Sequence, residues 1–273
     1  MKNQILKKEA KIKRFGFGKN WKNFLYSITD EHIENSKKKL LDSMEMSHLK
    51  GKSFLDVGSG SGLSSLSAKM SEASVFSFDY DKHSVSSTQF LKNKFFQNDE
   101  DWQIEQGSVL DKDYMQNIGK FDIVYSWGVL HHTGQMKMAL ENINYNVKKG
   151  GYLFIAIYND QGVRSRIWKI LKRTFVNYKI TRPFFISLGY VLFWVPQLFK
   201  GILMGKPNFQ KEYKKKRGMS VHHDIVDWMG GYPFEVAKRG EIISFYKKQG
   251  YELKNLISCG NKLGCNEFIF KKI

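Results

Sequence analysis

The sequence predicts an α/β fold built on a mostly parallel sheet, and three observations support this. Between residues 51 and 160, short apolar runs with high strand propensity alternate with amphipathic helical patterns, which is typical of parallel sheets. The first run, 53–57, passes directly into a glycine-rich turn and then into a helical pattern. After an interruption of different composition, the pattern resumes with a helix at 241–249 and strands at 251–257 and 265–270.

The strands of the alternating region are expected where apolar or β-branched runs are bounded by polar residues or glycine. The final run is almost continuously apolar, as expected for a strand that is buried on both faces. In chain order the expected strands are 53–57, 74–78, 102–106, 121–126 and 152–158.

Helices are expected where apolar residues recur every three or four positions. Asp30 is a suitable N-cap for the first of them, and Gly150 and Gly151 provide a C-terminal stop for the last. In chain order the expected helices are 30–48, 63–70, 83–96 and 136–147.

Charge divides the chain into parts. The net charge is +18, yet residues 1–22 carry eight Lys/Arg against one Glu, and residues 164–217 carry fourteen against one. The remainder is nearly neutral, so the excess lies on two appendages. An anionic partner such as a membrane surface, an acidic glycan or nucleic acid would explain this distribution, and so would a simple need for solubility. The expected units are a basic aromatic arm with a cap helix, an α/β core, a helical insert and a C-terminal part that completes the sheet, at 1–50, 51–160, 161–235 and 236–273.

The insert combines basic and apolar segments. Residues 163–176 predict a basic amphipathic helix, and 183–199 contain no charged residue. The uncharged segment is short for a membrane span and is interrupted by Gly189 and Pro196, so a lid or a helix lying on a bilayer is favoured over a span. The choice between lid and surface helix stays open. The helix at 163–176 carries an apolar side made of Ile167, Ile170, Leu171 and Phe175.

The number of cysteines and the N-terminal sequence indicate the metal content and the cellular compartment. Cys259 and Cys265 are too few for a disulfide framework and fit no zinc spacing, so no metal is expected. No apolar signal core precedes Phe15, which predicts a cytoplasmic protein, either free or bound to the membrane periphery.

The turn after the first strand carries the clearest site pattern. Glycine permits positive φ and a close backbone approach, and the N–H groups of the following helix point at whatever lies over the turn. A nucleotide-like cofactor is therefore expected here, but the dinucleotide spacing is absent because Leu63 occupies its last glycine position. The pattern instead reads Asp56-x-Gly58-x-Gly60-x-Gly62, with Ser59 inside the turn.

A second piece of the pattern lies at the end of the second strand. Asp79 and Tyr80 follow this strand about 20 residues after the turn, where a carboxylate can accept hydrogen bonds from ribose hydroxyls. Asp81 directly precedes the next helix and is the better candidate for its N-cap.

These segments resemble the class I S-adenosylmethionine-dependent methyltransferases, whose motif I matches the turn. The resemblance covers about residues 50–158 and includes the segments 106–111, 121–132 and 147–153. It implies a Rossmann-like, seven-stranded, mostly parallel sheet with helices on both faces, in which the last strand is antiparallel and lies between strands five and six. It also implies S-adenosyl-L-methionine as the cofactor.

The resemblance assigns residues to parts of that cofactor. Ser108 and Val109 would flank the adenine, although most family members carry an acidic residue where Ser108 stands. Trp127 would line the pocket around the methionine end of the cofactor. The implied cofactor-binding set is completed by Asp56, Gly58, Ser59, Gly60, Gly62, Asp79 and Tyr80.

Candidates for a general base come from two segments. His131 and His132 follow the fourth strand, where an acceptor could meet the methyl group, and histidine is the natural base near neutral pH. The run 222–235 is dense in titratable and aromatic residues. Gly230, Gly231 and Pro233 predict a tight turn there, which would either hold His223, Asp227 and Glu235 toward the cleft or dock the insert on the sheet. His223 is the preferred base of this run, with Asp227 orienting it.

The expected function is O-methylation of a small molecule, a sugar or a lipid-linked precursor. Two alternatives stay open: an RNA methyltransferase that uses the basic insert, and a non-catalytic membrane-surface adaptor with a relict fold. A nucleic-acid substrate is disfavoured because Ser126-Trp127-Gly128-Val129 lacks the proline motifs of enzymes that methylate nucleic-acid amino groups or cytosine C5. The sequence gives no indication of oligomeric state.

Overall fold

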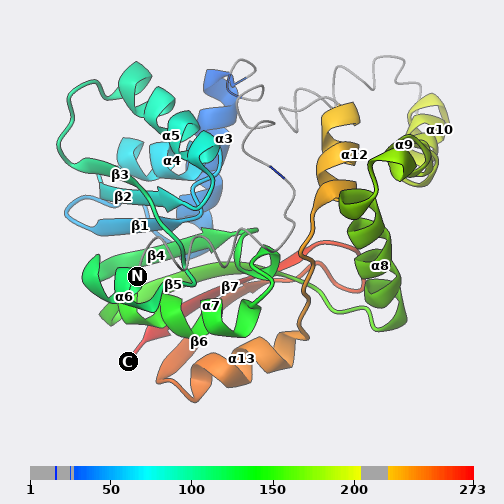
Figure 1. Cartoon of the computed structure of the whole chain (residues 1–273). Coiled ribbons are helices and arrows are strands. Elements are labelled where there is room, and N and C mark those ends of the chain that lie inside the picture. The colour runs from blue at the N-terminus through cyan, green and yellow to red at the C-terminus, as the bar shows by residue number, and fades with distance from the viewer. Residues whose placement is uncertain (1–15, 17–24, 26–27, 204–220) are drawn as a thin grey trace.

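The computed structural model describes residues 16, 25, 28–203 and 221–273, arranged around a seven-stranded sheet with a helical insert beside it (Figure 1). Most of the predicted basic arm and the basic stretch 204–220 therefore lie outside the described residues.

The sheet confirms the predicted topology. Its strand order is β3-β2-β1-β4-β5-β7-β6. Strands β1 to β5 run parallel, whereas β7 is antiparallel to both of its neighbours, β5 and β6. The strands are β1 Ser53–Val57, β2 Ser74–Asp79, β3 Trp102–Gln106, β4 Phe121–Trp127, β5 Val147–Tyr158, β6 Tyr251–Ile257 and β7 Cys265–Lys272.

Two hydrophobic clusters fill the space between the sheet and its helices. One face is covered by α3 Asp30–Met44, α4 Leu63–Met70 and α5 Lys82–Phe95. The opposite face is covered by α6 Lys112–Asn117, α7 Met136–Ile143 and α13 Arg239–Lys247. Side chains alternate between the faces of a strand, so in β1 Phe54 joins the first cluster while Leu55 and Val57 join the second.

Several helix boundaries differ from the prediction; α3, for example, ends at Met44 instead of residue 48. Two of the predicted helix-end signals are also wrong. The N-cap of α3 is Thr29, whose hydroxyl accepts from the His32 N–H, so Asp30 is the first helical residue instead of the cap. Helix α7 ends at Ile143, and the expected stop at Gly150 and Gly151 lies inside β5. Gly150 has φ 75° in the stretch where the β4–β5 register shifts. A left-handed glycine in a bulge and one at a helix end have the same sequence signature.

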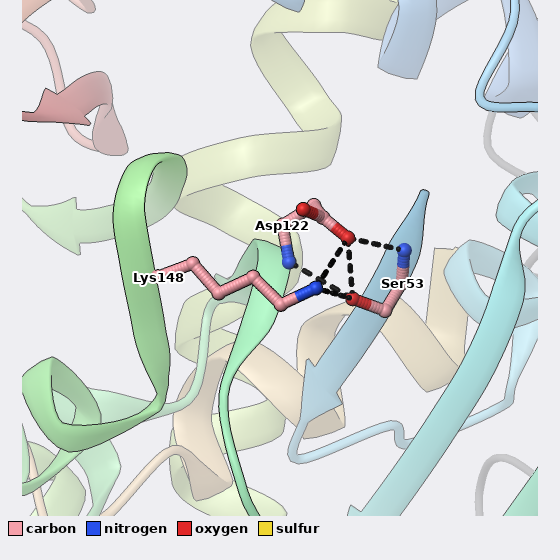
Figure 2. A network of polar contacts seen from close by, with 3 residues as sticks. All are labelled: Ser53, Asp122 and Lys148. Carbon is pink, nitrogen blue, oxygen red and sulfur yellow. Dashed lines mark hydrogen bonds and ion pairs between the residues drawn. The ribbon is translucent and has the colours of Figure 1, made fainter. Parts of the chain in front are cut away.

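A polar network joins the amino ends of the central strands (Figure 2). Asp122 of β4 accepts hydrogen bonds from the Ser53 hydroxyl at 2.6 Å and from the Lys148 Nζ at 2.9 Å. Burial opposes ionisation, but the hydrogen bonds from Ser53 and Lys148 prevail and lower the pKa of Asp122 to about 2. The network ties β1, β4 and β5 together at the edge of the sheet where these strands begin.

The insert has a small hydrophobic cluster of its own, centred on Phe175, Phe185, Ile225 and Met229. Its elements are α8 Val163–Asn177, η3 Lys179–Thr181, α9 Arg182–Gly189, the π-helical η4 Tyr190–Trp194, α10 Val195–Leu203 and α12 Val221–Gly230. Helices α9 and α12 pack closely, because a Cβ at Gly189 would lie 2.5 Å from Cγ2 of Ile225.

The apolar side expected for α8 is only half buried. Phe175 is buried and Leu171 packs against the cluster, whereas Ile167 and Ile170 are exposed. A lysine, Lys172, takes the interior position instead and is fully buried. The helix therefore turns a different face to the protein than its hydrophobic spacing indicates.

Candidate active site

A cavity of about 1200 Å³ lies at the carboxyl ends of β1, β2 and β4. This is where ligands bind in open α/β sheets. The core contributes the turn after β1, the ends of β2 and β4 and the segment after β3. The insert contributes residues of η4, α10 and α12. The cavity exceeds the usual size of a site for one drug-sized ligand, so two small molecules fit together.

The glycine turn has the backbone that its sequence predicts. Gly58, Gly60 and Gly62 all have positive φ, at 78°, 56° and 82°. Two of them are also required by packing within the chain. A Cβ at Gly58 would lie 2.5 Å from Cγ1 of Val129, and one at Gly62 would lie 2.7 Å from Cα of Thr88. At these two positions the absence of a side chain prevents clashes with Val129 and Thr88 of the same chain.

Asp79 lies at the end of β2, beside the turn. Its carboxylate accepts hydrogen bonds from the Gly60 N–H at 3.0 Å and the Asp81 N–H at 2.8 Å. Burial raises the pKa of Asp79 to about 6, even though both hydrogen bonds favour the charged form. Asp81 instead accepts a hydrogen bond from the His83 N–H and is the N-cap of α5, which confirms the prediction for Asp81.

Asp56 lies deeper, at the floor of the cavity. The Ser65 hydroxyl donates to its carboxylate at 2.5 Å. Burial raises the pKa of Asp56 to about 7, and the charge of Asp79 raises it further, while the Ser65 bond opposes the shift. A buried carboxylate, Asp56, and a partly buried one, Asp79, thus share one end of the sheet.

The residues expected around the adenine and the methionine end also line the cavity. Tyr80, Ser108 and Val109 lie on its wall, and Ser59 lies in the turn. The Ser108 hydroxyl accepts from the Leu110 N–H at 3.1 Å. Trp127 is half exposed at the end of β4, where the Nζ of Lys39 lies 5.2 Å from its ring centroid.

The two adjacent histidines occupy different positions. His132 lines the cavity, and its Nδ1 donates to the Pro233 carbonyl at 2.7 Å. His131 is fully buried and packs against the rings of His132 and Tyr158, with ring centroids 4.5 Å and 4.0 Å away. Burial lowers the pKa of both rings, that of His132 to about 4.

The run 222–235 is helical as far as Gly230, and the chain leaves the helix at Gly230 and Gly231, where the tight turn was predicted. Its helical part forms most of α12. Asp227 lines the cavity from this helix, whereas the side chain of His223 lies outside the described residues. Glu235 was one of the residues that could face the cleft, but it does not line the cavity. Its carboxylate instead accepts a hydrogen bond from the Met136 N–H at the start of α7.

Sequence reasoning missed Lys172. Its Nζ lies 4.1 Å from the ring centroid of Trp228 and 5.1 Å from that of Phe234, and it donates to the Trp228 carbonyl. Burial lowers its pKa to about 7. A Cβ at Gly231 would lie 3.4 Å from this Nζ and 3.1 Å from Cε1 of His132, so the lysine and the histidine are close neighbours. Its sequence signal is hidden among the many basic residues of the insert.

The arrangement defines a class of protein. A 3-2-1-4-5-7-6 sheet with a glycine turn after β1 and a carboxylate at the end of β2 is the class I S-adenosylmethionine-dependent methyltransferase fold. A family model described as a methyltransferase domain matches residues 29–188, more than half of the chain. The chain therefore belongs to the methyltransferase domain family and is a methyltransferase.

Solved structures with the same fold are distant in sequence. An O-methyltransferase family protein from Burkholderia thailandensis superposes with a TM-score of 0.51 at 12% identity, over 89% of this chain and 57% of that one. Magnesium protoporphyrin IX methyltransferase from Synechocystis PCC 6803 with bound SAH superposes with a TM-score of 0.52 at 12% identity, over 89% and 84%. The chain thus spans little more than half the length of the first of these proteins. No curated protein sequence matches it.

The cavity fits the S-adenosylmethionine that this class uses. Asp79 combines an ionisable carboxylate with a position beside the turn, as a ribose acceptor requires. The positive-φ turn and Ser108 with Val109 supply the remaining walls. When bound, the cofactor supplies an activated methyl group on a sulfonium centre. Within the described residues, no group of three or more His, Cys, Asp or Glu side chains could hold a metal ion.

Proposed function

We propose that the enzyme methylates a hydroxyl group of a small molecule, a sugar or a lipid-linked precursor, with His132 as the general base. The observation that carries this proposal is the position of His132. It is a neutral histidine on the wall of the cavity, in the short 3-10 helix Leu130–His132 that follows β4, and its orientation is fixed by a backbone carbonyl. His223 and Asp227 stay as the second candidate pair, from α12.

The hydrogen bond of His132 determines which ring nitrogen is basic. A carbonyl only accepts, so the bond to Pro233 places the proton of the neutral ring on Nδ1 and leaves the lone pair on Nε2. Because burial lowers the pKa of the ring to about 4, the ring is neutral at physiological pH. It is therefore ready to accept a proton at any pH where the cell operates.

A weak base is sufficient for this reaction. The acceptor oxygen uses one lone pair to form the new bond to carbon, while the bond from sulfur to carbon breaks and its electron pair stays on sulfur. The hydroxyl proton becomes strongly acidic as the oxygen acquires the methyl group, and it moves to Nε2 of His132. The insert roofs part of the cavity, and exclusion of water by this roof in the substrate complex would protect the methyl donor from hydrolysis.

The proposal is tested with labelled cofactor. The full chain is incubated with methyl-labelled S-adenosylmethionine and cell extracts that are separated into lipid, glycan, RNA and small-molecule fractions. Label that is stable to conditions cleaving esters and is attached to oxygen supports the proposal. Label on RNA, or on nitrogen or carbon of the product, contradicts it.

A matched pair of variants tests the base. His132→Gln should lower kcat by about 100-fold or more while cofactor affinity is retained, since a general base contributes about 10²–10⁴ in rate. His48→Gln, at an exposed histidine between α3 and β1, is the control. The wild-type kcat should also stay level down to about one pH unit above the pKa of His132. Unchanged turnover in His132→Gln removes this residue from the mechanism.

A further inference from the structure

The helical run α9–η4–α10 has two functional faces. Its inner face contributes Phe193, Trp194 and Gln197 to the wall of the cavity. The same side packs on α12, where Gly189 allows Ile225 to approach closely. This run is therefore a fixed part of the roof over the site.

The outer face of the run is apolar and solvent-exposed. Its exposed positions follow a helical stripe with spacings of three, four and seven residues, as on one side of a single helix. Ile202 is 64% exposed and Phe184 is 67% exposed, which is unusual for side chains of this kind in a soluble domain. The exposed members are Phe184, Val191, Leu192, Val195, Leu198, Phe199, Ile202 and Leu203.

Charge around this stripe identifies what covers it. No Asp or Glu occurs from residue 164 to residue 211, and Lys179 and Arg182 lie at the start of the run. A second copy of the chain would bring two strongly basic segments together, and their repulsion opposes such a contact. An anionic bilayer instead accepts the apolar stripe between its acyl chains and attracts the basic residues to its headgroups.

The run Lys179–Leu203 is long and apolar enough to cross a membrane, and only 12% of its most apolar window is buried. Crossing would nevertheless remove Phe185 from its cluster with Ile225 and Met229 and would open the cavity. A position in the plane of the interface keeps both sets of contacts.

We infer that α9–η4–α10 docks on an anionic membrane surface through its outer stripe while its inner face roofs the active site. Building on the proposed function, the methyl acceptor is then an amphiphile whose hydroxyl-bearing head enters the cavity from the bilayer. The apolar roof residues Phe193, Trp194, Ile225 and Trp228 suit the neck of such a molecule.

Vesicle binding tests the surface without any need for activity. The full chain is sedimented with vesicles of phosphatidylcholine alone and of phosphatidylcholine mixed with phosphatidylglycerol. Binding is expected to the anionic vesicles, to be weakened by added salt, and to be released by alkaline carbonate washing. The double variant Val191→Gln/Leu198→Gln keeps the net charge and should bind about tenfold more weakly.

Phe90→Gln, which removes an exposed aromatic from α5 on the core, is the matched control and should bind as the wild type does. Equal binding of the double variant and the control overturns the inference. Resistance to carbonate washing overturns it in favour of a membrane span. A dimer in sedimentation equilibrium that the double variant dissociates overturns it in favour of a second copy.

The acceptor is tested separately from the surface. Methyl label in the organic phase of a lipid extract supports an amphiphilic acceptor, and label confined to water-soluble hydroxyl compounds overturns that part of the inference while the proposed function stands. If oxygen methylation is found in no fraction, the proposed function fails, and the vesicle measurement still decides whether the stripe docks on membranes.

Discussion

The two ends of the central sheet hold their carboxylates in opposite ways. At the amino end, Asp122 is paired with Lys148 and Ser53, and these hydrogen bonds overcome burial to lower its pKa to about 2 (Figure 2). At the carboxyl end, burial dominates and raises the pKa of Asp79 to about 6 and that of Asp56 to about 7.

The difference indicates a structural role for Asp122, and we propose that Asp56 and Asp79 are kept for a ligand. Asp122 has its cation within the protein, so its charge is stabilised as soon as the chain folds. Asp56 is buried and Asp79 is partly buried. The hydrogen bonds that lower their pKa values come from hydroxyl and amide groups and not from a cation. Ribose hydroxyls that donate hydrogen bonds and a positive charge brought by a ligand would favour their charged forms.

The largest effect is expected from neutralising the carboxylate beside the turn. Asp79→Asn should weaken S-adenosylmethionine binding by about 100-fold, because hydrogen bonds to a charged acceptor contribute about 1.5–3 kcal/mol. Titration calorimetry with the cofactor and its demethylated product measures this, and thermal melting checks that the variant is folded. Asp122→Asn, the same substitution at the other end, should bind the cofactor as the wild type does. Equal affinities in both variants would remove the distinction between the ends.

The raised pKa of Asp79 makes cofactor binding depend on pH. An acid with a raised pKa is ionised only as the pH rises through that value, here about 6. If the cofactor needs the ionised form, its affinity should fall by up to about tenfold for each pH unit below the pKa. Calorimetry in buffers of different ionisation enthalpy counts the protons released on binding. Asp79→Asn should release fewer, and an unchanged proton count would assign the pH dependence to another group.

The raised pKa values of Asp56 and Asp79 also predict how the stability of the cofactor-free protein depends on pH. Because the folded state holds protons on Asp56 and Asp79 that the unfolded state has lost, this stabilisation is complete below the ordinary carboxyl pKa. It is lost as the pH rises through about 6 and 7. The cofactor-free protein therefore becomes less stable over the pH range in which cofactor binding improves.

Much of this fold is encoded locally and could be predicted. Strands such as 53–57 and 251–257 have the predicted bounds, since each is a short apolar run closed by polar residues. The glycine turn was equally accessible, because positive φ at Gly58, Gly60 and Gly62 demands glycine in the sequence. The position of β7 between β5 and β6 came from the resemblance to the methyltransferase class, since no local pattern specifies it.

What could not be predicted depends on distant contacts. The cage of Lys172 is formed by Trp228 and Phe234, more than 50 residues further along the chain. No local pattern marks a lysine whose burial is created by such partners. Gly150 was misassigned to a helix end because its left-handed backbone serves a strand bulge as well.

The next prediction concerns Lys172, the buried lysine that lies close to His132. Its pKa is lowered by burial to about 7, so its favourable contribution is present above the ordinary lysine pKa and is lost as the pH falls through 7. Lys172→Met should raise the free energy of unfolding near neutral pH by about 2 kcal/mol, because it removes a desolvated charge. It should also abolish the increase of stability with pH above neutrality, as measured by denaturant unfolding.

The exposed neighbour on the same helix is the control, and Lys169→Met should change stability little. A functional readout separates positioning from packing. The charge of Lys172 adds to burial in lowering the pKa of His132, so Lys172→Met should move the acidic limb of the kcat profile to higher pH. A variant that is stabilised but keeps the wild-type profile would limit Lys172 to a structural role.

The smallest effect is expected at the amino end. Asp122→Asn should lower the free energy of unfolding by about 1 kcal/mol, because the carboxylate accepts three charge-assisted hydrogen bonds but its pair with Lys148 is partly exposed to solvent. Since the pKa of Asp122 is lowered to about 2, its contribution is complete above the ordinary carboxyl pKa and disappears as the pH falls through 2. The variant and the wild type should therefore converge in stability in strong acid. A double-mutant cycle with Lys148→Met should give a coupling below about 1 kcal/mol, and a much larger coupling would mean that this end of the sheet carries more of the fold than its exposure indicates.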